Sequence, residues 1–399
     1  METQTKHQLS IDKRNWIPVK FGDVVFEPKE STKDPVNEGI QHVVGLEHIE
    51  SNDVHLRKFS SLESTTTFTK KFVAGDVLFG RRRAYLKKAA LASFNGICSG
   101  DITVFRAKDK QVLPELLPFI VHNEKFFDYA VKHSAGGLSP RVKFKDLANY
   151  EFLLPPKDQQ AELAELLWAM NNAVEQNLEL KNSLSNFFER MKNDSVTGKL
   201  SSNSKNWKDY VFGSLGNSFG GLSGKTKNDF GEGKPFINYM NVFSNAVVNP
   251  SQFDKVRIGN NEKQNEIKYG DILFTGSSET PEEVGMASVV LDYLSGYYLN
   301  SFCFGFRLND FEILRPEYAK HLMRSAFVRQ FMTRRAQGST RFNISKSVIK
   351  EKLKIVLPET NEQLEIAATL DSIESSIMLL DQKISESKTL HKSIINQIF

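Results

Sequence analysis

Cysteine is scarce in this sequence, and the residue clusters that bind metals are missing. The 399 residues include only two cysteines, Cys98 and Cys303, too few for a disulfide framework or a zinc cluster. Both lie in apolar runs, so we expect buried thiols in a reducing compartment. The eight histidines are scattered and form no His-Glu-x-x-His motif. The sequence therefore predicts no metal site.

Long hydrophobic runs are missing as well. No segment approaches the roughly 18 apolar residues of a membrane-spanning helix. Residues 1–15 are polar and contain no apolar stretch of the kind found in signal peptides. These absences predict a soluble, cytoplasmic protein.

Recognisable catalytic motifs do not occur either. Gly220–Thr226 resembles a phosphate-binding loop, but it is one residue too short and no helical pattern follows it. Asp254 with Glu266 and Lys268 would fit a nuclease, yet such combinations arise by chance in chains of this size. The Asn/Asp-Pro-Pro-aromatic motif of amino-methyltransferases is not present. We therefore predict no catalytic residue and no cofactor in this chain.

What the sequence does contain is an internal repeat. The segment Gly-Asp-Val-Leu-Phe at Gly75–Phe79 returns as Gly-Asp-Ile-Leu-Phe at Gly270–Phe274. A Leu-Pro pair followed by Gln-x-Glu also occurs twice, at 154–162 and 357–365. The matches keep their order, which indicates two copies of one domain, each followed by a connector. We predict a first domain at 1–155, a central helix at 156–200, a second domain at 201–357 and a C-terminal helix at 358–399.

Each copy begins with a segment typical of an α+β domain. Short β-prone stretches at 101–106 and 302–307 predict strands. Pro114 and Pro316 suit the starts of one or two helices that reach Lys132 and Arg335. The predicted fold class is α+β, with two similar domains separated by two long antiparallel coiled-coil helices in a pseudo-two-fold arrangement.

Both connectors have the pattern of long amphipathic helices. Residues 159–191 contain neither glycine nor proline, and apolar residues recur in both connectors at alternating spacings of three and four, which is a heptad seam. A single amphipathic helix is not stable alone, so the two helices most simply pack on each other. The alternative is that each helix packs on its own domain. The seam residues are Leu163, Leu167, Met170, Val174, Leu184, Ile366, Leu370, Ile373, Ile377, Leu380 and Ile384.

Charge is segregated along the chain. Residues 320–354 carry ten basic side chains and a single acid, whereas residues 359–386 carry seven acids and one base. In the first copy, a triple arginine and two lysines follow the Gly-Asp motif directly. Basic domains joined to acidic helices suit a protein whose domains contact nucleic-acid phosphates while its helices contact protein.

Three polar loops in each domain are candidates for reading bases. Arginine on a loop can bind guanine with two hydrogen bonds, and glycine lets the backbone approach a ligand closely. Each candidate residue could equally be an ordinary surface side chain or part of a turn. The candidates are Arg81, Arg82, Arg83, Lys87, Lys88, Ser139, Arg141 and Lys143 in the first domain, and Asn238, Tyr239, Thr275, Ser277, Ser278, Arg334, Arg335, Ser339, Thr340 and Arg341 in the second.

Together these motifs resemble the specificity (S) subunits of type I restriction–modification systems along nearly the whole chain. The resemblance rests on the two Gly-Asp motifs, on 43–49, 270–281 and 338–341, and on the Leu-Pro…Gln-x-Glu helix starts. It implies two target-recognition domains that each read one half of a bipartite double-stranded DNA site. The helices would set the gap between the halves and dock two methyltransferase (modification) subunits, with motor–nuclease (restriction) subunits completing the complex. S-adenosylmethionine, ATP and Mg²⁺ would belong to those partners, and this chain would be non-catalytic.

One departure limits the resemblance, because the triple arginine at 81–83 has no basic counterpart in the second half. Contacts therefore cannot be transferred between the halves. Two other interpretations stay open at this point. One is a coiled-coil scaffold whose basic domains bind RNA or protein, and the other is a solitary DNA nuclease or methyltransferase.

Overall fold

The computed structural model describes residues 11–62 and 67–399. The chain divides into two units, one comprising residues 1–178 with 382–399 and the other residues 179–381. Both unit boundaries fall within the two long helices. The N-terminal segment for which we predicted no signal peptide lies largely in residues 1–10, outside the described part. Among the described residues, no helix combines the length and apolarity that crossing a membrane requires.

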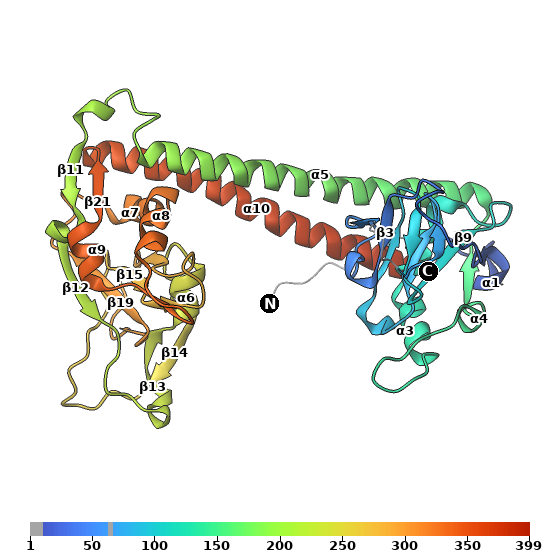
Figure 1. Cartoon of the computed structure of the whole chain (residues 1–399), viewed down its shortest axis with the longest axis horizontal. Coiled ribbons are helices and arrows are strands. Elements are labelled where there is room, and N and C mark those ends of the chain that lie inside the picture. The colour runs from blue at the N-terminus through green and yellow to red at the C-terminus, as the bar shows by residue number, and fades with distance from the viewer. Residues whose placement is uncertain (1–10, 63–66) are drawn as a thin grey trace. The chain divides into compact units, whose positions relative to one another are not determined.

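The first unit contains ten strands and four short helices among its described residues (Figure 1). Its strands are β1 (Ile17–Lys20), β2 (Val25–Phe26), β3 (His42–Val44), β4 (Ser60–Ser61), β5 (Lys70–Phe72), β6 (Val77–Gly80), β7 (Ala89–Leu91), β8 (Gly96–Cys98), β9 (Ile102–Ala107) and β10 (Glu151–Leu154). Its short helices are α1 (Phe21–Val24), α2 (Leu117–Val121), α3 (Glu124–Lys132) and α4 (Phe144–Leu147). They form sheets β2-β9-β6-β7 and β4-β3-β8-β5, with β1 paired to β10.

The second unit repeats this arrangement. Its strands are β11 (Lys208–Val211), β12 (Gly216–Gly220), β13 (Phe230–Ile237), β14 (Phe253–Val256), β15 (Ile272–Thr275), β16 (Ser277–Ser278), β17 (Ala287–Val289), β18 (Tyr298–Leu299), β19 (Cys303–Leu308), β20 (Phe342–Asn343) and β21 (Lys354–Leu357). Its short helices are α6 (Tyr239–Ser244), α7 (Pro316–Met323), α8 (Ala326–Arg335) and α9 (Lys346–Lys352). The sheet β12-β19-β15-β17 and the pair β11-β21 match β2-β9-β6-β7 and β1-β10. The predicted α+β class with two similar domains is confirmed.

The repeated Gly-Asp motif is a structural device at the start of the central strand. Gly75 and Gly270 have φ of 93° and 83°, a region that favours glycine. The following carboxylates, Asp76 and Asp271, are buried, and each accepts two hydrogen bonds from an arginine on the neighbouring strand. These arginines are Arg106 on β9 and Arg307 on β19. Because a buried carboxylate needs such partners, the motif and its arginine recur together.

The repeated glutamine locks each long helix to its domain. Gln160 and Gln363 are buried, and their amide groups donate to the carbonyl oxygens of Pro155 and Pro358, at 2.9 Å in both cases. Each side-chain oxygen also accepts from a backbone N–H of the domain, that of Leu113 or Arg315. The Leu-Pro…Gln pattern therefore marks the point at which a helix leaves its domain.

The helices predicted to begin at Pro114 and Pro316 are each broken in two. In the first unit, a one-turn 3₁₀ helix (Pro114–Leu116) leads into α2 and then α3, and in the second unit α7 is followed by α8. The breaks occur because Asn123 and Ser325 cap the second helix of each pair, accepting from backbone N–H groups two or three residues later.

The two long helices are present with nearly the predicted ends. They are α5 (Lys157–Val196) and α10 (Thr360–Ile398), and Figure 1 shows them alongside each other within each unit. Every predicted seam residue is buried or half-buried. Each unit's core takes in the first turns of one long helix and the last turns of the other. Neither helix packs on its own domain alone.

The cysteines have the environment that the sequence predicts. Cys98 and Cys303 are both buried and free. Burial raises the pKa of each thiol to about 12, so neither forms a reactive thiolate at neutral pH.

Candidate DNA interface

Two of the predicted loops of the first domain meet side by side. Arg82 and Arg141 form an antiparallel bridge. The bridge is flanked by hydrogen bonds from Arg83 N to Pro140 O at 2.8 Å and from Val142 N to Arg81 O at 3.0 Å. Segments 59 residues apart in the sequence therefore present one continuous polar edge.

One carboxylate organises the arginines at this edge. Asp101 accepts from Arg141 Nε at 2.6 Å and from Arg82 Nη1 at 3.3 Å. The hydrogen bond from Arg141, together with the contact to Arg82, lowers the pKa of Asp101. Arg82 and Arg83 also donate to Ser139 Oγ, at 3.0 and 3.4 Å. The guanidinium groups are thus held in place before any ligand arrives, which reduces the entropy that binding must remove.

The lysines predicted beside this edge are less available. Lys87 forms an ion pair with Glu124, and Lys88 donates to the carbonyl oxygen of Leu46 at 2.7 Å. Lys143, which precedes α4, is exposed. Of the three lysines, Lys143 is the best placed for a phosphate.

The second domain brings its own two loops together in the same way. Strand β16 pairs with β20, with Ser277 opposite Asn343 and Ser278 opposite Phe342. Ile344 N donates to Gly276 O at 3.1 Å, as Val142 N does to Arg81 O in the first domain. By this correspondence, Ser277 and Asn343 occupy the places of Arg82 and Arg141.

A pocket of about 350 Å³ opens beside this pair of strands. Four predicted residues line it, namely Tyr239, Ser277, Ser278 and Arg341. Tyr239 donates its hydroxyl to Ser277 O at 2.8 Å, which ties α6 to β16. The remaining lining residues are Met240, Phe243, Glu279, Glu283 and Phe302. The pocket therefore joins aromatic walls to a polar rim.

Several other predicted residues of the second domain have structural contacts. Thr275 is fully buried, and its hydroxyl oxygen accepts from Met286 N at 2.9 Å. The Asn238 side chain caps α6 and donates to Asp254 at 3.1 Å. Arg334, Arg335, Ser339 and Thr340 are exposed. Burial makes Thr275 the weakest member of the predicted set, because a ligand cannot reach its side chain.

The basic run at 320–354 is not one continuous solvated face. Arg324 and Arg329 point inward and donate to backbone carbonyl groups, four and three of them respectively. Desolvation lowers the pKa of both groups. Only the later part of the run, from Arg334 onward, remains available for phosphates.

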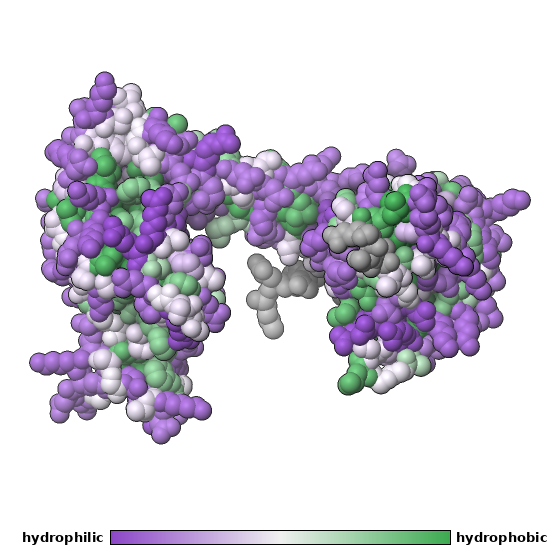
Figure 2. All heavy atoms as spheres, in the orientation of Figure 1, coloured by the Kyte–Doolittle hydropathy of each residue, from purple (hydrophilic) through white to green (hydrophobic). Residues whose placement is uncertain are grey.

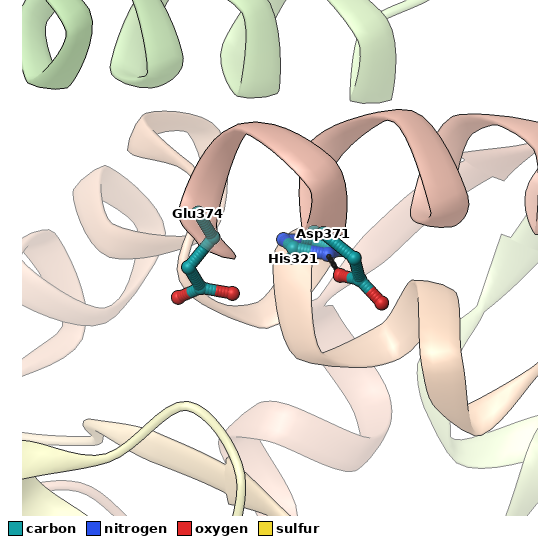
Figure 3. Close-up of side chains that lie close together, drawn as sticks. All are labelled: His321, Asp371 and Glu374. Atoms are coloured by element: carbon teal, nitrogen blue, oxygen red, sulfur yellow. Dashed lines mark hydrogen bonds and ion pairs between the residues drawn. The ribbon is translucent and has the colours of Figure 1, made fainter. Parts of the chain in front are cut away.

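Lys320, also in this run, belongs to a charged cluster between α7 and α10. His321 Nε2 lies 2.6 Å from Asp371 Oδ1, with Glu374 nearby (Figure 3). Among the described residues this is the one trio of possible metal ligands close together. Lys320 Nζ, however, lies 2.7 Å from Asp371 and 4.0 Å from Glu374. The ammonium group supplies the positive charge there, so the cluster is best understood as the ionic contact between helix and domain.

The structure adds candidates that sequence reasoning missed. Leu138 is 97% exposed at the tip of the Gly-Gly-Leu-Ser loop, and Met240 and Phe302 are each 58% exposed at the pocket of the second domain. Hydrophobic side chains reach the visible surface of both units among mostly hydrophilic ones (Figure 2). Asn343 was missed because its place beside Ser277 depends on strand pairing. Apolar side chains can contact a thymine methyl group, and asparagine can pair with adenine.

Comparison with known proteins places the chain in a family. The family model described as "Type I restriction modification DNA specificity domain" matches residues 13–186 and 204–388. The type I restriction enzyme EcoDI specificity subunit of Escherichia coli is 25% identical over 166 residues, which are 40% of this chain and 36% of that protein. The aligned part thus spans little more than a third of that curated relative.

Solved structures show the same fold over the whole chain. A structure from a study of complex assembly and conformational transition of the type I R-M system covers 96% of both chains, with a TM-score of 0.62 and 19% identity. The S subunit of a type I system from M. genitalium covers 98% of both, with a TM-score of 0.57 and 12% identity. The HsdS subunit from Thermoanaerobacter tengcongensis covers 97% of both, with a TM-score of 0.51 and 20% identity.

The family match bears on one of the interpretations that the sequence left open. Specificity subunits are not themselves catalytic, so the solitary nuclease or methyltransferase is not supported. The two matched segments follow the internal repeat, one in each half of the chain. This chain therefore belongs to the family of type I restriction–modification specificity subunits, with two copies of the specificity domain.

Proposed function

We propose that the chain reads a bipartite double-stranded DNA site, with each domain reading one half. The observation that carries the proposal is the paired loop edge, which recurs at the same place in both domains with different side chains. The first domain presents Arg82 and Arg141 there, and the second presents Ser277 and Asn343. A common framework with unlike edges is what two unlike half-sites require.

The loop edges divide into base-reading and phosphate-contacting groups. Arginine recognises guanine and asparagine recognises adenine through paired hydrogen bonds in the major groove. In the first domain we assign base reading to Arg82 and Arg141, which Asp101 and Ser139 hold in place. Exposed cations farther out, such as Lys143 and Arg334, contact phosphates and position the domain without reading sequence.

We assign the long helices two tasks, setting the gap between the half-sites and docking two methyltransferase subunits. The helices have 40 and 39 residues. At about 1.5 Å per residue each is roughly 60 Å long, which corresponds to about 18 base pairs of B-DNA. The acidic residues of α10 that face solvent give the partners a surface distinct from the basic DNA edge. In this proposal S-adenosylmethionine, ATP and Mg²⁺ act on the methyltransferase and motor–nuclease subunits.

Selection from random duplexes tests the reading role. We expect the full chain, co-expressed with its methyltransferase subunit, to enrich two short motifs separated by a fixed gap. Matched RNA duplexes should compete at least about tenfold less well than DNA, because A-form RNA hides its base edges in a deep, narrow groove. Enrichment of a single motif, or equal competition by RNA, would overturn the proposal.

Shortening both helices tests whether they set the gap between the half-sites. Lys181 on α5 and Asp381 on α10 form an ion pair at 2.5 Å, so these two residues lie at the same level of the two helices. Deleting seven residues around each of them preserves the heptad seam and removes about 10 Å, or roughly three base pairs. We expect methylation at the same half-sites with a shorter gap. Altered half-sites at the original gap would contradict the assignment.

A further inference from the structure

The first unit contains a pocket that the DNA-reading function does not use. It has a volume of about 460 Å³ and lies where the domain meets α5 and α10. The domain contributes residues 50–54 and His122, α5 contributes Asn171 and Glu175, and α10 contributes His391. All of these residues belong to one unit.

The corresponding place in the second unit is filled by an arginine. Arg324 donates to four backbone carbonyl oxygens, those of Ala287, Val242, Phe243 and Asn245, at 2.6 to 3.0 Å. Arginine carries five N–H donors on a planar group, which explains why one side chain can satisfy so many acceptors. The space is thus shaped for a guanidinium group.

The topology shows that His122 occupies the position of Arg324. Each residue ends the first helix of the broken pair, α2 or α7, and directly precedes the capping residue of the next helix. Each also donates to an alanine carbonyl on the strand next to the central one. That alanine is Ala89 on β7 or Ala287 on β17, and both lie opposite the phenylalanine of the Gly-Asp motif.

The segment that supplies three of the carbonyl groups around Arg324 also has a counterpart in the first unit. Leu91 N donates to Val54 O, as Val289 N donates to Ala246 O. Counting back from these equivalent residues, Glu50, Ser51 and Asp53 correspond to Val242, Phe243 and Asn245. These three residues line the pocket beside His122. The imidazole is shorter than an arginine side chain, and its hydrogen bond among the described residues is to Ala89 O, at 2.9 Å.

A second hydrogen-bond acceptor in the pocket, His391 Nε2, favours a ligand with several hydrogen-bond donors. His391 is 8% exposed, and its Nε2 has no hydrogen-bond partner among the described residues. The backbone of Leu167 bonds to His391, so the other ring nitrogen carries the hydrogen and Nε2 is free to accept. Burial lowers the pKa of His391, and desolvation lowers that of His122 to about 4. Both rings are therefore neutral near pH 7.

Net charge at the pocket is balanced. Glu50, Asp53 and Glu175 are opposed by Arg57, Lys388 and Lys392. Arg57 bonds to both Asp53 and Glu175, and Lys392 pairs with Glu124. Attraction for a ligand therefore depends on hydrogen-bond acceptors more than on charge, which predicts specific but weak binding.

We propose that this pocket binds a monosubstituted guanidinium group, in the place that Arg324 fills in the second unit. The planar cation would donate to the carbonyl groups of residues 50–53 and to His391 Nε2. Its source is either a small guanidine compound or the arginine side chain of a partner protein, since both carry the same group. The proposal does not depend on DNA reading, because none of the pocket residues belongs to the loop edge.

Calorimetric titration of the full chain with methylguanidinium tests the proposal. We expect saturable binding that methylurea and methylammonium, each lacking part of the charge or donor set, do not reproduce. His122→Arg should fill the pocket from within and weaken binding at least about tenfold. His133→Arg is the matched control, since it adds an arginine to the same unit outside the pocket and should leave binding unchanged. No binding to the wild-type chain, or equal binding by His122→Arg, would overturn the proposal.

A second variant keeps the test decisive if His122→Arg fails to fold. His391→Phe retains a ring that packs against Phe119, whose centroid lies 5.6 Å from that of His391, and removes the Nε2 acceptor. We expect binding to weaken several-fold, and unchanged binding would count against the proposed acceptor. A blocked Gly-Arg-Gly peptide distinguishes the sources. Binding as tight as that of methylguanidinium would identify a protein arginine, and binding of the small compound alone would identify a free ligand.

Discussion

The two domains of this chain differ at the loop edges that we propose contact DNA. They are alike in the buried contacts that stabilise each domain. Both keep the Gly-Asp turn, the arginine that binds its buried carboxylate, and the buried glutamine at the start of the long helix. At the loop edge, however, Arg82 and Arg141 of one domain are replaced by Ser277 and Asn343 in the other. Buried polar groups constrain each other because an unpaired one is costly, whereas exposed loop residues are free to diverge.

A second difference lies inside the molecule. Among the described residues, His122 in the first unit makes one hydrogen bond at the place where Arg324 makes four in the second. One unit therefore has an open pocket where the other has an internal side chain. The duplication preserved the strand pairing beside this space but not its contents.

The largest effect should come from breaking the shared framework. Asp271→Asn leaves Arg307 without its carboxylate and should destabilise the second unit by about 3 kcal/mol. Burial raises the pKa of Asp271 in spite of Arg307, so this carboxylate depends strongly on its partner. Asp76→Asn should cost less, because Arg106 keeps an ion pair to Glu30 at 2.7 Å. Unfolding in denaturant, monitored by hydrogen exchange, would measure the loss of stability in both variants. Asp209→Asn, which changes an exposed carboxylate, is the control. Equal losses of stability in Asp271→Asn and Asp76→Asn would contradict this expected difference between the two domains.

Removing the arginines of the first edge should affect one half-site only. The triple replacement of Arg81, Arg82 and Arg83 by alanine should weaken DNA binding by about 10- to 100-fold and flatten its salt dependence. The loss should fall on the half-site of the first domain. A salt titration on duplexes mutated in one half at a time would measure it. Ser277→Ala with Ser278→Ala is the matched control, and an effect of the arginine variant on the second half-site would contradict the assignment.

Asn343→Ala should relax the reading of a single base in the second half-site. An asparagine that pairs with adenine discriminates against other bases by about 1–3 kcal/mol, and Asn343 already donates to Arg341 O at 3.3 Å, so we expect the lower end. Sequencing the methylated sites of cells that express the variant would show degeneracy at one position. Unchanged specificity would mean that Asn343 supports the loop without touching DNA.

Low pH should destabilise the first unit more than the second, because the first unit has a histidine, His122, where the second has Arg324. Desolvation lowers the pKa of His122 to about 4. The hydrogen bond to Ala89 and the charge of Asp53 oppose this shift of the pKa, and His391 adds to it. The unfolded chain takes up a proton near pH 6.5, which the folded unit resists, so stability falls as pH drops from about 6.5 toward 4. We expect a loss of about 1 kcal/mol between pH 7 and 5.5. His122→Gln should remove most of this dependence in hydrogen exchange, with a smaller part left from His391, and a wild-type profile in that variant would refute the explanation.

Much of the architecture was predictable from local patterns. The heptad seam predicted both long helices because a 3.5-residue period is a property of neighbouring residues. The break between α2 and α3 was not predicted, because Asn123 caps a helix inside a segment that otherwise reads as helical. The inward direction of Arg324 and Arg329 was missed for a related reason. The sequence of a basic run does not show whether its side chains are solvated or bond to buried carbonyl groups.

The candidate DNA edge was predictable only in part. The sequence identified Arg81, Arg82 and Arg83 separately from Ser139 and Arg141, without indicating that the two groups lie side by side. It did not identify Asn343 or the exposed Leu138, because their importance depends on what lies beside them. Thr275 looked available in the sequence but is buried, since β15 is covered on both faces.

The duplication, the two helical connectors and the segregation of charge could all be recognised in the sequence alone, because they are patterns along the chain. The three-dimensional arrangement determines which of the basic and polar residues form an edge. Arg82 meets Arg141, and Ser277 meets Asn343, only after strands far apart in the chain pair. It also decided that His122 borders an open pocket where Arg324 fills its own. Such outcomes depend on distances between non-neighbouring residues, which no local pattern contains.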